Sequence, residues 1–83
     1  MEFYTEEEAK FLINYYSKLL IGTSIEPPKE IFINRLELEL YDGGNYRVIC
    51  RVDEYRGATI ISDVATVSRL NGIELPQDVL ANR

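Results

Sequence analysis

The sequence predicts a two-layer α+β domain spanning residues 1–83, with an N-terminal helix and a C-terminal helix packed on one face of an antiparallel sheet of two or three strands. Three observations lead to this fold class. Apolar residues recur at helical spacing after Thr5, residues 36–41 and 46–55 alternate between apolar and polar, and residues 64–70 return to helical spacing. The order is therefore helix, strand, strand, helix, with a third strand before the last helix left open.

A first helix is predicted over residues 5–21. Thr5 as N-cap and Glu8 three residues later form a capping box, and Gly22 supplies the left-handed residue that ends such a helix. The apolar side chains of this helix cover an arc of roughly 200°, twice the usual minimum of about 100°. The centre of the arc is Ala9, Leu12, Tyr16 and Leu19, with Ile13 and Leu20 on one flank and Phe11 and Tyr15 on the other.

Two strands are predicted on either side of a turn at residues 42–45, whose composition is Asp-Gly-Gly-Asn. In the first strand three leucines alternate with polar residues, and residues 46–55 form the second strand. Because Ile31 and Ile33 have the opposite parity from these leucines, we expect a bulge or bend near Asn34 and Arg35.

The register of this hairpin follows from keeping like faces together, because a slip of one residue inverts every side chain. We expect the core-face pairs Leu40–Val48, Leu38–Cys50 and Leu36–Val52, and the outer-face pairs Glu37–Arg51, Arg35–Asp53 and Tyr41–Arg47. A three-residue loop at residues 43–45, with Asn45 in the left-handed region, produces this register.

The last third of the chain is predicted to hold a short strand at residues 58–61 and a helix at residues 63–71, with Ser62 as its N-cap and Gly72 at its end. Several residues here are β-branched and favour a strand over a helix: Thr59, Ile60, Ile61, Thr66 and Val67. Pro76 fits the first position of a final helical turn. Val64, Val67 and Leu70 of the helix, and Leu75, Val79 and Leu80 of the last turn, are expected in the core.

The inventory of catalytic groups is small. The chain has no histidine, and its one cysteine, Cys50, falls on the core face of the second strand, where a thiol acts as a small apolar residue. Gly43 and Gly44 belong to the hairpin turn, and no phosphate-binding glycine motif occurs. Glu37 and Glu39 share a strand face, as a carboxylate pair or metal site requires, but arginines across the hairpin favour surface ion pairs. We therefore expect no enzymatic activity, no cofactor and no metal.

The net charge of −5, from 14 acidic and 9 basic residues, bears on the class of partner. An acidic chain repels phosphate, so direct nucleic-acid binding is not expected, although tyrosines and arginines on the outer sheet face resemble a base-stacking platform. The acidic surface instead supports an alternative function, that of an inhibitor or immunity-type protein blocking a basic site on a nuclease or other nucleic-acid enzyme.

The sequence also predicts a location. Its first residues lack the basic start and apolar stretch of a signal peptide, and no apolar run is long enough to cross a membrane. A single cysteine fits a reducing compartment. We expect a cytoplasmic protein without membrane contact.

Two predicted surfaces carry more aromatic and apolar side chains than a soluble protein needs to expose. The first is the outer sheet face, whose residue types are enriched in binding hot spots: Tyr41, Arg47, Ile49, Arg51 and Tyr55. The second is the flank of the first helix, where Phe11 and Tyr15 are the expected contact of a homodimer.

Each surface has a plainer interpretation: a solvated sheet face with one stray isoleucine, and a small domain wrapped around a wide helix face. The leading expectation is a small non-enzymatic protein–protein interaction domain. It is expected to form a homodimer through the helix flank or a sheet edge.

Overall fold

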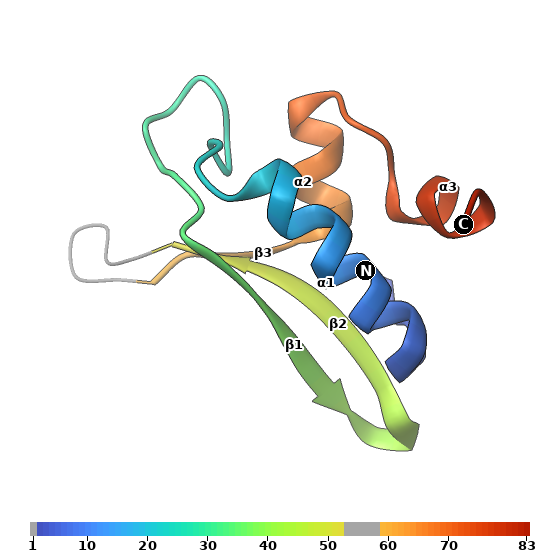
Figure 1. The fold of residues 1–83 in the computed structure, drawn as a ribbon. Helices are drawn as coiled ribbons and strands as arrows, with labels where there is room; N and C mark the ends of the chain where they lie inside the picture. Colours follow the sequence, from blue (N-terminus) through green and yellow to red (C-terminus); the bar gives the residue numbers. More distant parts are fainter. Residues whose placement is uncertain (1, 53–58) are drawn as a thin grey trace.

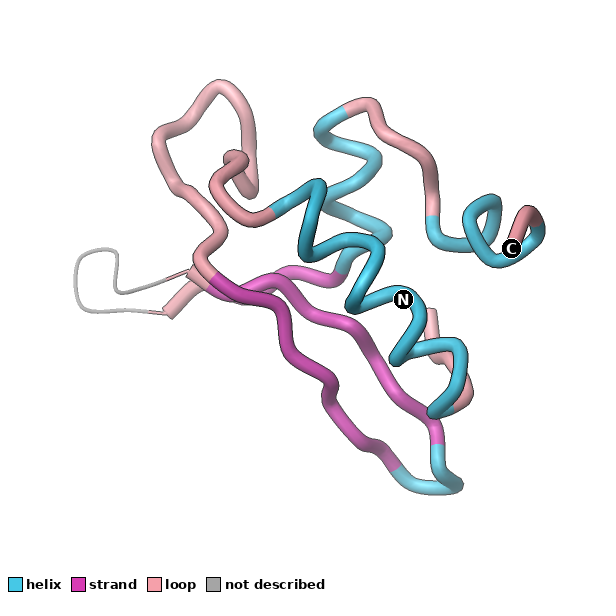
Figure 2. Tube along the Cα trace, viewed as in Figure 1, coloured by secondary structure: helices cyan, strands magenta, loops and turns pink. Residues whose placement is uncertain are grey.

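A computed structural model describes residues 2–52 and 59–83 and confirms the predicted α+β architecture (Figure 1). The helices are α1 (Glu6–Leu20), α2 (Val64–Asn71) and α3 (Pro76–Ala81), and the strands are β1 (Arg35–Tyr41), β2 (Asn45–Arg51) and β3 (Ile61–Asp63). The strands form an antiparallel sheet in the order β1-β2-β3. In Figure 2 the helices lie together and the strands form a separate layer, with α1 running along the sheet.

The start of α1 is the capping box that the sequence predicts. The Thr5 hydroxyl accepts from the Glu8 backbone N–H at 3.2 Å, and the Thr5 backbone N–H donates to the Glu8 carboxylate at 3.0 Å. The helix ends at Leu20, and Gly22 has a φ of 90°, in the left-handed region that favours glycine. Both boundaries of the first helix are therefore confirmed to within one residue.

The buried side of α1 is Ala9, Leu12, Tyr16 and Leu20. The prediction that Leu19 lies at the centre of the apolar arc is wrong, because Leu19 is 45% exposed. Leu12, Tyr16 and Leu20 follow one another at spacings of four, which keeps them on one face of a helix with 3.6 residues per turn. The core therefore lies towards the Leu20 flank, and the opposite flank is left open.

The hairpin register is displaced by two residues from the predicted one. Leu36 pairs with Cys50, Leu38 with Val48 and Leu40 with Tyr46, instead of the expected pairs Leu36–Val52, Leu38–Cys50 and Leu40–Val48. The loop has three residues as predicted, but it is Asp42–Gly44 rather than residues 43–45. A shift of two residues preserves the faces of both strands, so the predicted core and outer faces are correct.

The reason for the displacement lies in the turn. Gly43 and Gly44 have φ values of 78° and 74°, whereas Asn45 has an extended backbone with φ of −89°. Glycine adopts positive φ at no steric cost, so two adjacent glycines supply the left-handed positions and Asn45 starts β2. As a result Leu40 lies at the turn end of the hairpin, which projects past the start of α1 (Figure 1), and is 63% exposed.

The bend predicted near Asn34 and Arg35 is present. Ile33 and Leu36 are both buried although they have opposite parity, so the chain changes face between them. Residues 22–33 form their own paired segment before this bend, in which the Ile25 backbone N–H donates to the Ile31 carbonyl at 2.8 Å. This segment contains a cis peptide bond between Pro27 and Pro28.

A third strand exists, but it lies later than predicted. β3 begins at Ile61 and reaches Asp63, which also replaces Ser62 as the N-cap of α2. The Asp63 carboxylate accepts from the Thr66 backbone N–H at 2.8 Å, and the negative charge of the acceptor strengthens this hydrogen bond. Gly72 ends α2 with a φ of 66°, as predicted.

Two details of the C-terminal helices complete the core. Val64 and Val67 are buried, but Leu70 is exposed, which is the opposite of the prediction. Residues three positions apart differ by about 60° in direction around the helix axis. After two such steps Leu70 points about 120° away from Val64 and no longer faces the core. In α3, Pro76 occupies the first helical turn as predicted, and Val79 is buried.

The three helices and the sheet share one apolar core. Its buried members come from every layer: Tyr4, Ala9, Leu12, Tyr16, Leu20, Ile25, Ile33, Leu36, Val48, Cys50, Val52, Val64, Val67 and Val79. Leu38, Leu80 and other half-buried apolar residues pack against this cluster. The core therefore lies on the α1 side of the sheet, and the outer face of the sheet is separate from it.

Candidate functional site

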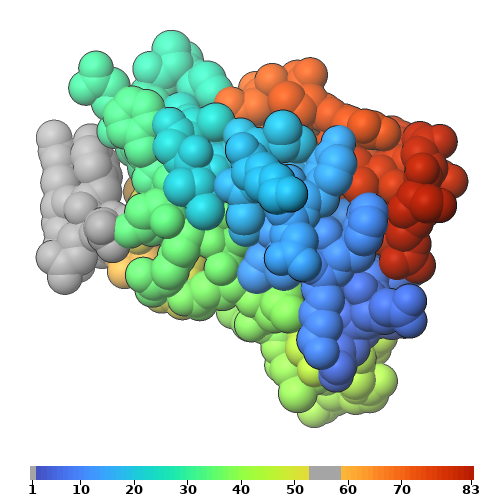
Figure 3. Space-filling view, viewed as in Figure 1, coloured from blue at the N-terminus to red at the C-terminus, as the bar shows by residue number. Residues whose placement is uncertain are grey.

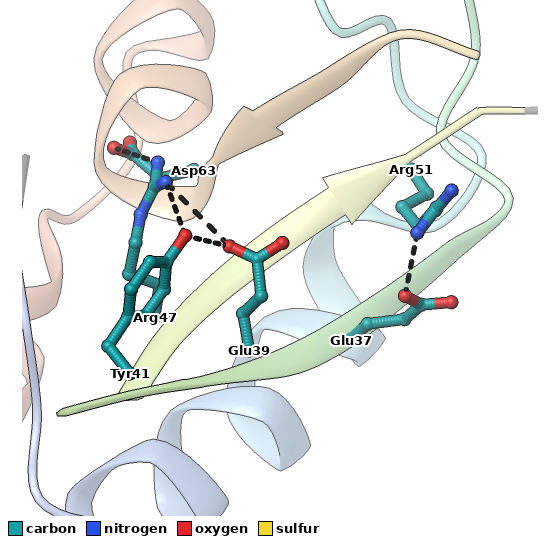
Figure 4. A network of polar contacts seen from close by, with 6 residues as sticks. All are labelled: Glu37, Glu39, Tyr41, Arg47, Arg51 and Asp63. Atoms are coloured by element: carbon teal, nitrogen blue, oxygen red, sulfur yellow. Dashed lines mark hydrogen bonds and ion pairs between the residues drawn. The ribbon is translucent and has the colours of Figure 1, made fainter. Parts of the chain in front are cut away.

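The outer sheet face carries a network of polar contacts (Figure 4). We use the name outer face for the side chains of β1, β2 and β3 that point away from α1. They are Arg35, Glu37, Glu39, Tyr41, Asn45, Arg47, Ile49, Arg51, Ile61 and Asp63. Tyr55, which the sequence also assigns to this face, lies outside the described residues.

Arg47 is the centre of this network. Its Nη2 lies 3.6 Å from Asp63 Oδ2, and its Nη1 lies 3.8 Å from Glu39 Oε1. The same Nη1 donates to the Tyr41 hydroxyl at 3.2 Å, and that hydroxyl donates to Glu39. The Arg47 side chain is only 15% exposed. Its guanidinium is therefore held by two carboxylates and a phenol of its own chain.

The negative charge of Asp63 is stabilised by its neighbours Thr66 and Arg47. Burial raises the pKa of this carboxyl, but hydrogen bonds from Thr66 and the charge of Arg47 outweigh burial, so the pKa of Asp63 falls below its usual value. Asp63 is therefore ionised at neutral pH and is available to both the cap and the ion pair.

A second group of charges surrounds Glu37. Arg35 Nε lies 2.7 Å from Glu37 Oε1, and Arg51 Nη1 lies 3.0 Å from Glu37 Oε2. The hydrogen bond from Arg35, together with that from Arg51, lowers the pKa of the Glu37 carboxyl despite its partial burial. The expected pair Glu37–Arg51 thus forms, as a diagonal contact rather than a directly opposed one, because the register is displaced by two residues.

The expectation that Ile49 is an exposed apolar residue of this face is wrong. Ile49 is 1% exposed and lies on β2 between Arg47 and Arg51, with Glu37 and Asp63 as its neighbours on the adjoining strands. Arg51 is itself only 26% exposed. Among the described residues, the outer face therefore consists of internal ion pairs around a buried isoleucine, and its accessible apolar groups are Tyr41 and Ile61, which are 38% and 46% exposed.

The chemistry available to Cys50 is limited by its position. The residue is fully buried, and this burial, with a smaller contribution from the charge of Asp63, raises the pKa of its thiol to about 12. The thiol is therefore protonated at neutral pH and is not a nucleophile. Within the described ranges no cluster of three or more metal-ligating side chains occurs, and no helix has the length and apolar character to cross a membrane.

The second predicted surface, the flank of α1, is open. Its residues Phe11, Asn14, Tyr15, Lys18 and Leu19 line a shallow groove of about 330 Å³, and we call this set the α1 surface. Phe11 is 37% exposed and its ring stacks beside that of Tyr15, with ring centroids 6.5 Å apart. The structure thus brings the two expected contact residues together.

Three members of the α1 surface were not predicted from the sequence as surface contacts. Hydrophobic periodicity does not single out Asn14 or Lys18, and it places Leu19 in the core. A usable signal is present, because Phe11, Tyr15 and Leu19 follow one another at uniform spacings of four, the same spacing as the buried residues on the other flank.

Residues from the end of the chain border the α1 surface. The Tyr15 hydroxyl donates to the Glu74 carboxylate at 3.4 Å, and the Arg83 guanidinium lies 5.6 Å from the centre of the Phe11 ring. From the core side, the hydroxyl of buried Tyr16 donates to the Glu74 carbonyl at 2.5 Å. The aromatic rings of this flank are therefore positioned by contacts with the segments on either side of α3.

Comparisons of this chain with family models, curated proteins and solved structures gave no match. The function is therefore argued from the two surfaces themselves. The charged groups of the outer face are paired within the chain, whereas the α1 surface exposes apolar groups around an unfilled groove.

Proposed function

We propose that this protein is a small, non-enzymatic protein–protein interaction domain that binds its partner through the α1 surface. The observation that carries the proposal is the groove of about 330 Å³, which exposes an aromatic and an aliphatic side chain on the helix flank that the core leaves open. Contiguous exposed apolar groups rimmed by polar residues are typical of interaction sites, and aromatic residues are enriched among binding hot spots.

The α1 surface is a better candidate than the outer face for an energetic reason. A partner that used Arg47 or Arg51 would have to compete with carboxylates that already lie within 3.0 to 3.8 Å of them. Breaking such pairs offsets much of what new contacts contribute. A partner at Phe11 and Leu19 instead removes apolar surface from water without disrupting any ion pair.

Two further features support the absence of enzymatic activity, and we propose in addition that the protein is cytoplasmic. The protonated thiol of Cys50 leaves the chain without an activated cysteine nucleophile, and the sequence contains no histidine. Because Cys50 is the only cysteine, the fold does not depend on an internal disulfide and suits a reducing compartment.

The proposal is tested by a pair of matched substitutions. Phe11→Ser removes an exposed phenylalanine of the α1 surface, and Phe32→Ser removes another exposed phenylalanine that does not line the groove. The wild type and both variants are immobilised, bound proteins are identified by mass spectrometry, and the affinity of each purified partner is measured by calorimetry.

We expect Phe11→Ser to weaken the affinity about tenfold or more, as truncation of a hot-spot aromatic does, and Phe32→Ser to leave it unchanged. The partner measured in this way is either another protein or a second copy of the chain. Equal affinity of both variants and the wild type for every partner would show that the α1 surface is not the binding site.

A further inference from the structure

One stripe of α1 carries charges of opposite sign at its two ends. Glu7, Phe11, Asn14 and Lys18 follow one another at spacings of four, three and four, so they lie in a line along the helix in the order acid, aromatic, amide, base. Glu7 and Lys18 are both exposed. Within residues 2–52 and 59–83, neither of them takes part in an ion pair.

This stripe is complementary to itself when it is reversed. We infer that the partner of the α1 surface is a second copy of this chain, packed antiparallel to the first through α1, an inference that rests on the proposed function. In an antiparallel pair, Glu7 of each copy faces Lys18 of the other, so a two-fold axis produces two ion pairs at once. A parallel pair would instead place Glu7 against Glu7 and Lys18 against Lys18.

The dimensions of a helix pair agree with this arrangement. Glu7 and Lys18 are separated by about 16 Å along the axis, at 1.5 Å per residue, and the two-fold axis then crosses α1 between residues 12 and 13. That axis places Phe11 of one copy against Asn14 and Tyr15 of the other, so the aromatic rings lie at the centre with the charges outside. Packed helices lie about 8–10 Å apart, within reach of lysine and glutamate side chains.

The face needed for this contact is accessible. Figure 3 shows α1, in blue to cyan, along the front of the molecule with no other element in front of it. The groove lined by Phe11 and Leu19 lies on the same helix and provides the apolar part of the interface. Glu7 and Lys18 at the ends of the stripe then set the direction in which a second helix lies.

The free edge of β1 is a less suitable contact between copies. β1 is an edge strand of the described sheet, with β2 as its neighbour. Two β1 strands paired antiparallel about Leu38 would place Glu37 of each copy opposite Glu39 of the other. Like charges directly opposed destabilise a strand pair, whereas the α1 stripe brings unlike charges together.

Charge reversal tests the antiparallel pairing. The variants are Glu7→Lys, Lys18→Glu, the double variant with both changes, and the control Glu30→Lys, which changes the net charge as Glu7→Lys does but on an exposed residue outside α1. The dissociation constant of the dimer is measured for each by sedimentation equilibrium up to high micromolar concentration. Circular dichroism measures the helix content of each variant.

We expect each single reversal to weaken the dimer about tenfold or more, because it replaces two attractive pairs by two repulsive ones. We expect the double variant to return to within about threefold of the wild type, and Glu30→Lys not to weaken the dimer. The two single reversals change the net charge in opposite directions, so general repulsion cannot weaken both. If Glu7→Lys destabilises the first turn of α1, the double variant is destabilised in the same way. A recovered dimer affinity in the double variant therefore cannot come from improved folding.

Two results would overturn the inference. If the wild type is a monomer at high micromolar concentration, no second copy occupies the α1 surface. If a dimer forms but the double variant does not recover, the copies are not paired antiparallel through this stripe. In either case the proposed function stands if Phe11→Ser still weakens binding of another protein, and it fails separately if Phe11→Ser has no effect on any partner.

Discussion

Arg47 on β2 and Asp63 at the end of β3 lie 3.6 Å apart, between Nη2 and Oδ2, and this ion pair joins the outer face to the first turn of α2. Asp63 has two functions in the structure, because its other oxygen, Oδ1, accepts from the backbone N–H of Thr66. Both side chains are largely shielded from water, so solvent screens the attraction between them less than it screens an exposed pair. The chain thus uses one carboxylate to start a helix and to fix a strand.

Substitution of Asp63 should separate these two functions. We expect Asp63→Ala to lower the free energy of unfolding by about 1–3 kcal/mol, because it removes the cap and leaves Arg47 without one of its carboxylates. Asp63→Asn keeps a side-chain oxygen for the cap and should cost less. Urea unfolding of both variants measures the difference, and equal losses would show that the cap contributes nothing beyond the ion pair.

Acid should destabilise the fold through the same residue. The pKa of Asp63 is lower in the folded protein than its ordinary value of 3.8, so its contribution to stability is fully present above about pH 5 and is lost as the pH falls through the folded pKa. We expect the free energy of unfolding to fall below about pH 4, and to fall less steeply for Asp63→Asn. Urea titrations across this range test it, with Glu30→Gln as a control; identical profiles for Asp63→Asn and the wild type would contradict the prediction.

The buried side chain of Ile49 should contribute measurably to the stability of the fold. We expect Ile49→Ala to lower the free energy of unfolding by about 2–4 kcal/mol, as truncation of a fully buried isoleucine does. Ile61→Ala, at an exposed position on the adjoining strand, should change it by no more than about 0.5 kcal/mol. If the two substitutions have equal effects, Ile49 is accessible to solvent and the outer face is a more open surface than described.

The sequence predicts local features of this fold well because they depend on neighbours in the chain. The capping box at Thr5, the left-handed residues Gly22 and Gly72, and the bend before Leu36 each involve residues a few positions apart. The faces of the hairpin are correct for the same reason, since alternation alone decides which side chains share a face. The predicted register of the hairpin is wrong, because a displacement of two residues satisfies the alternation of apolar and polar residues equally well.

Burial on the outer face depends on contacts that alternation does not describe. Arg47 is shielded because β3 pairs with β2 and brings Asp63 beside it, and these residues are 16 positions apart in the chain. Likewise, the choice between Leu19 and Leu20 depends on where the sheet lies relative to α1, which packs against β1 and β2. The open flank of α1 can therefore be identified only once the positions of the other elements around α1 are known.

The turn offers a direct test of the displaced register. Gly44 has a φ of 74° and open space where a Cβ atom would lie, so Gly44→Ala should cost about 1–2 kcal/mol from backbone strain alone. Asn45→Gly should also destabilise, because Asn45 is extended and glycine would only add entropy to the unfolded chain. A gain in the free energy of unfolding for Asn45→Gly would indicate that Asn45, not Gly44, occupies the left-handed position.

The two surfaces should respond in opposite ways to alanine. We expect Arg47→Ala to lower the free energy of unfolding, because it leaves Asp63 and Glu39 without their cation, and to leave binding by the folded protein unchanged. Phe11→Ala should weaken binding while changing stability by less than about 1 kcal/mol, because its side chain is already partly exposed. Thermal unfolding and calorimetric titration with the same partner measure both quantities for each variant. The opposite pattern, weaker binding for Arg47→Ala and unchanged binding for Phe11→Ala, would place the recognition site on the outer face, where the tyrosines and arginines of the hairpin lie.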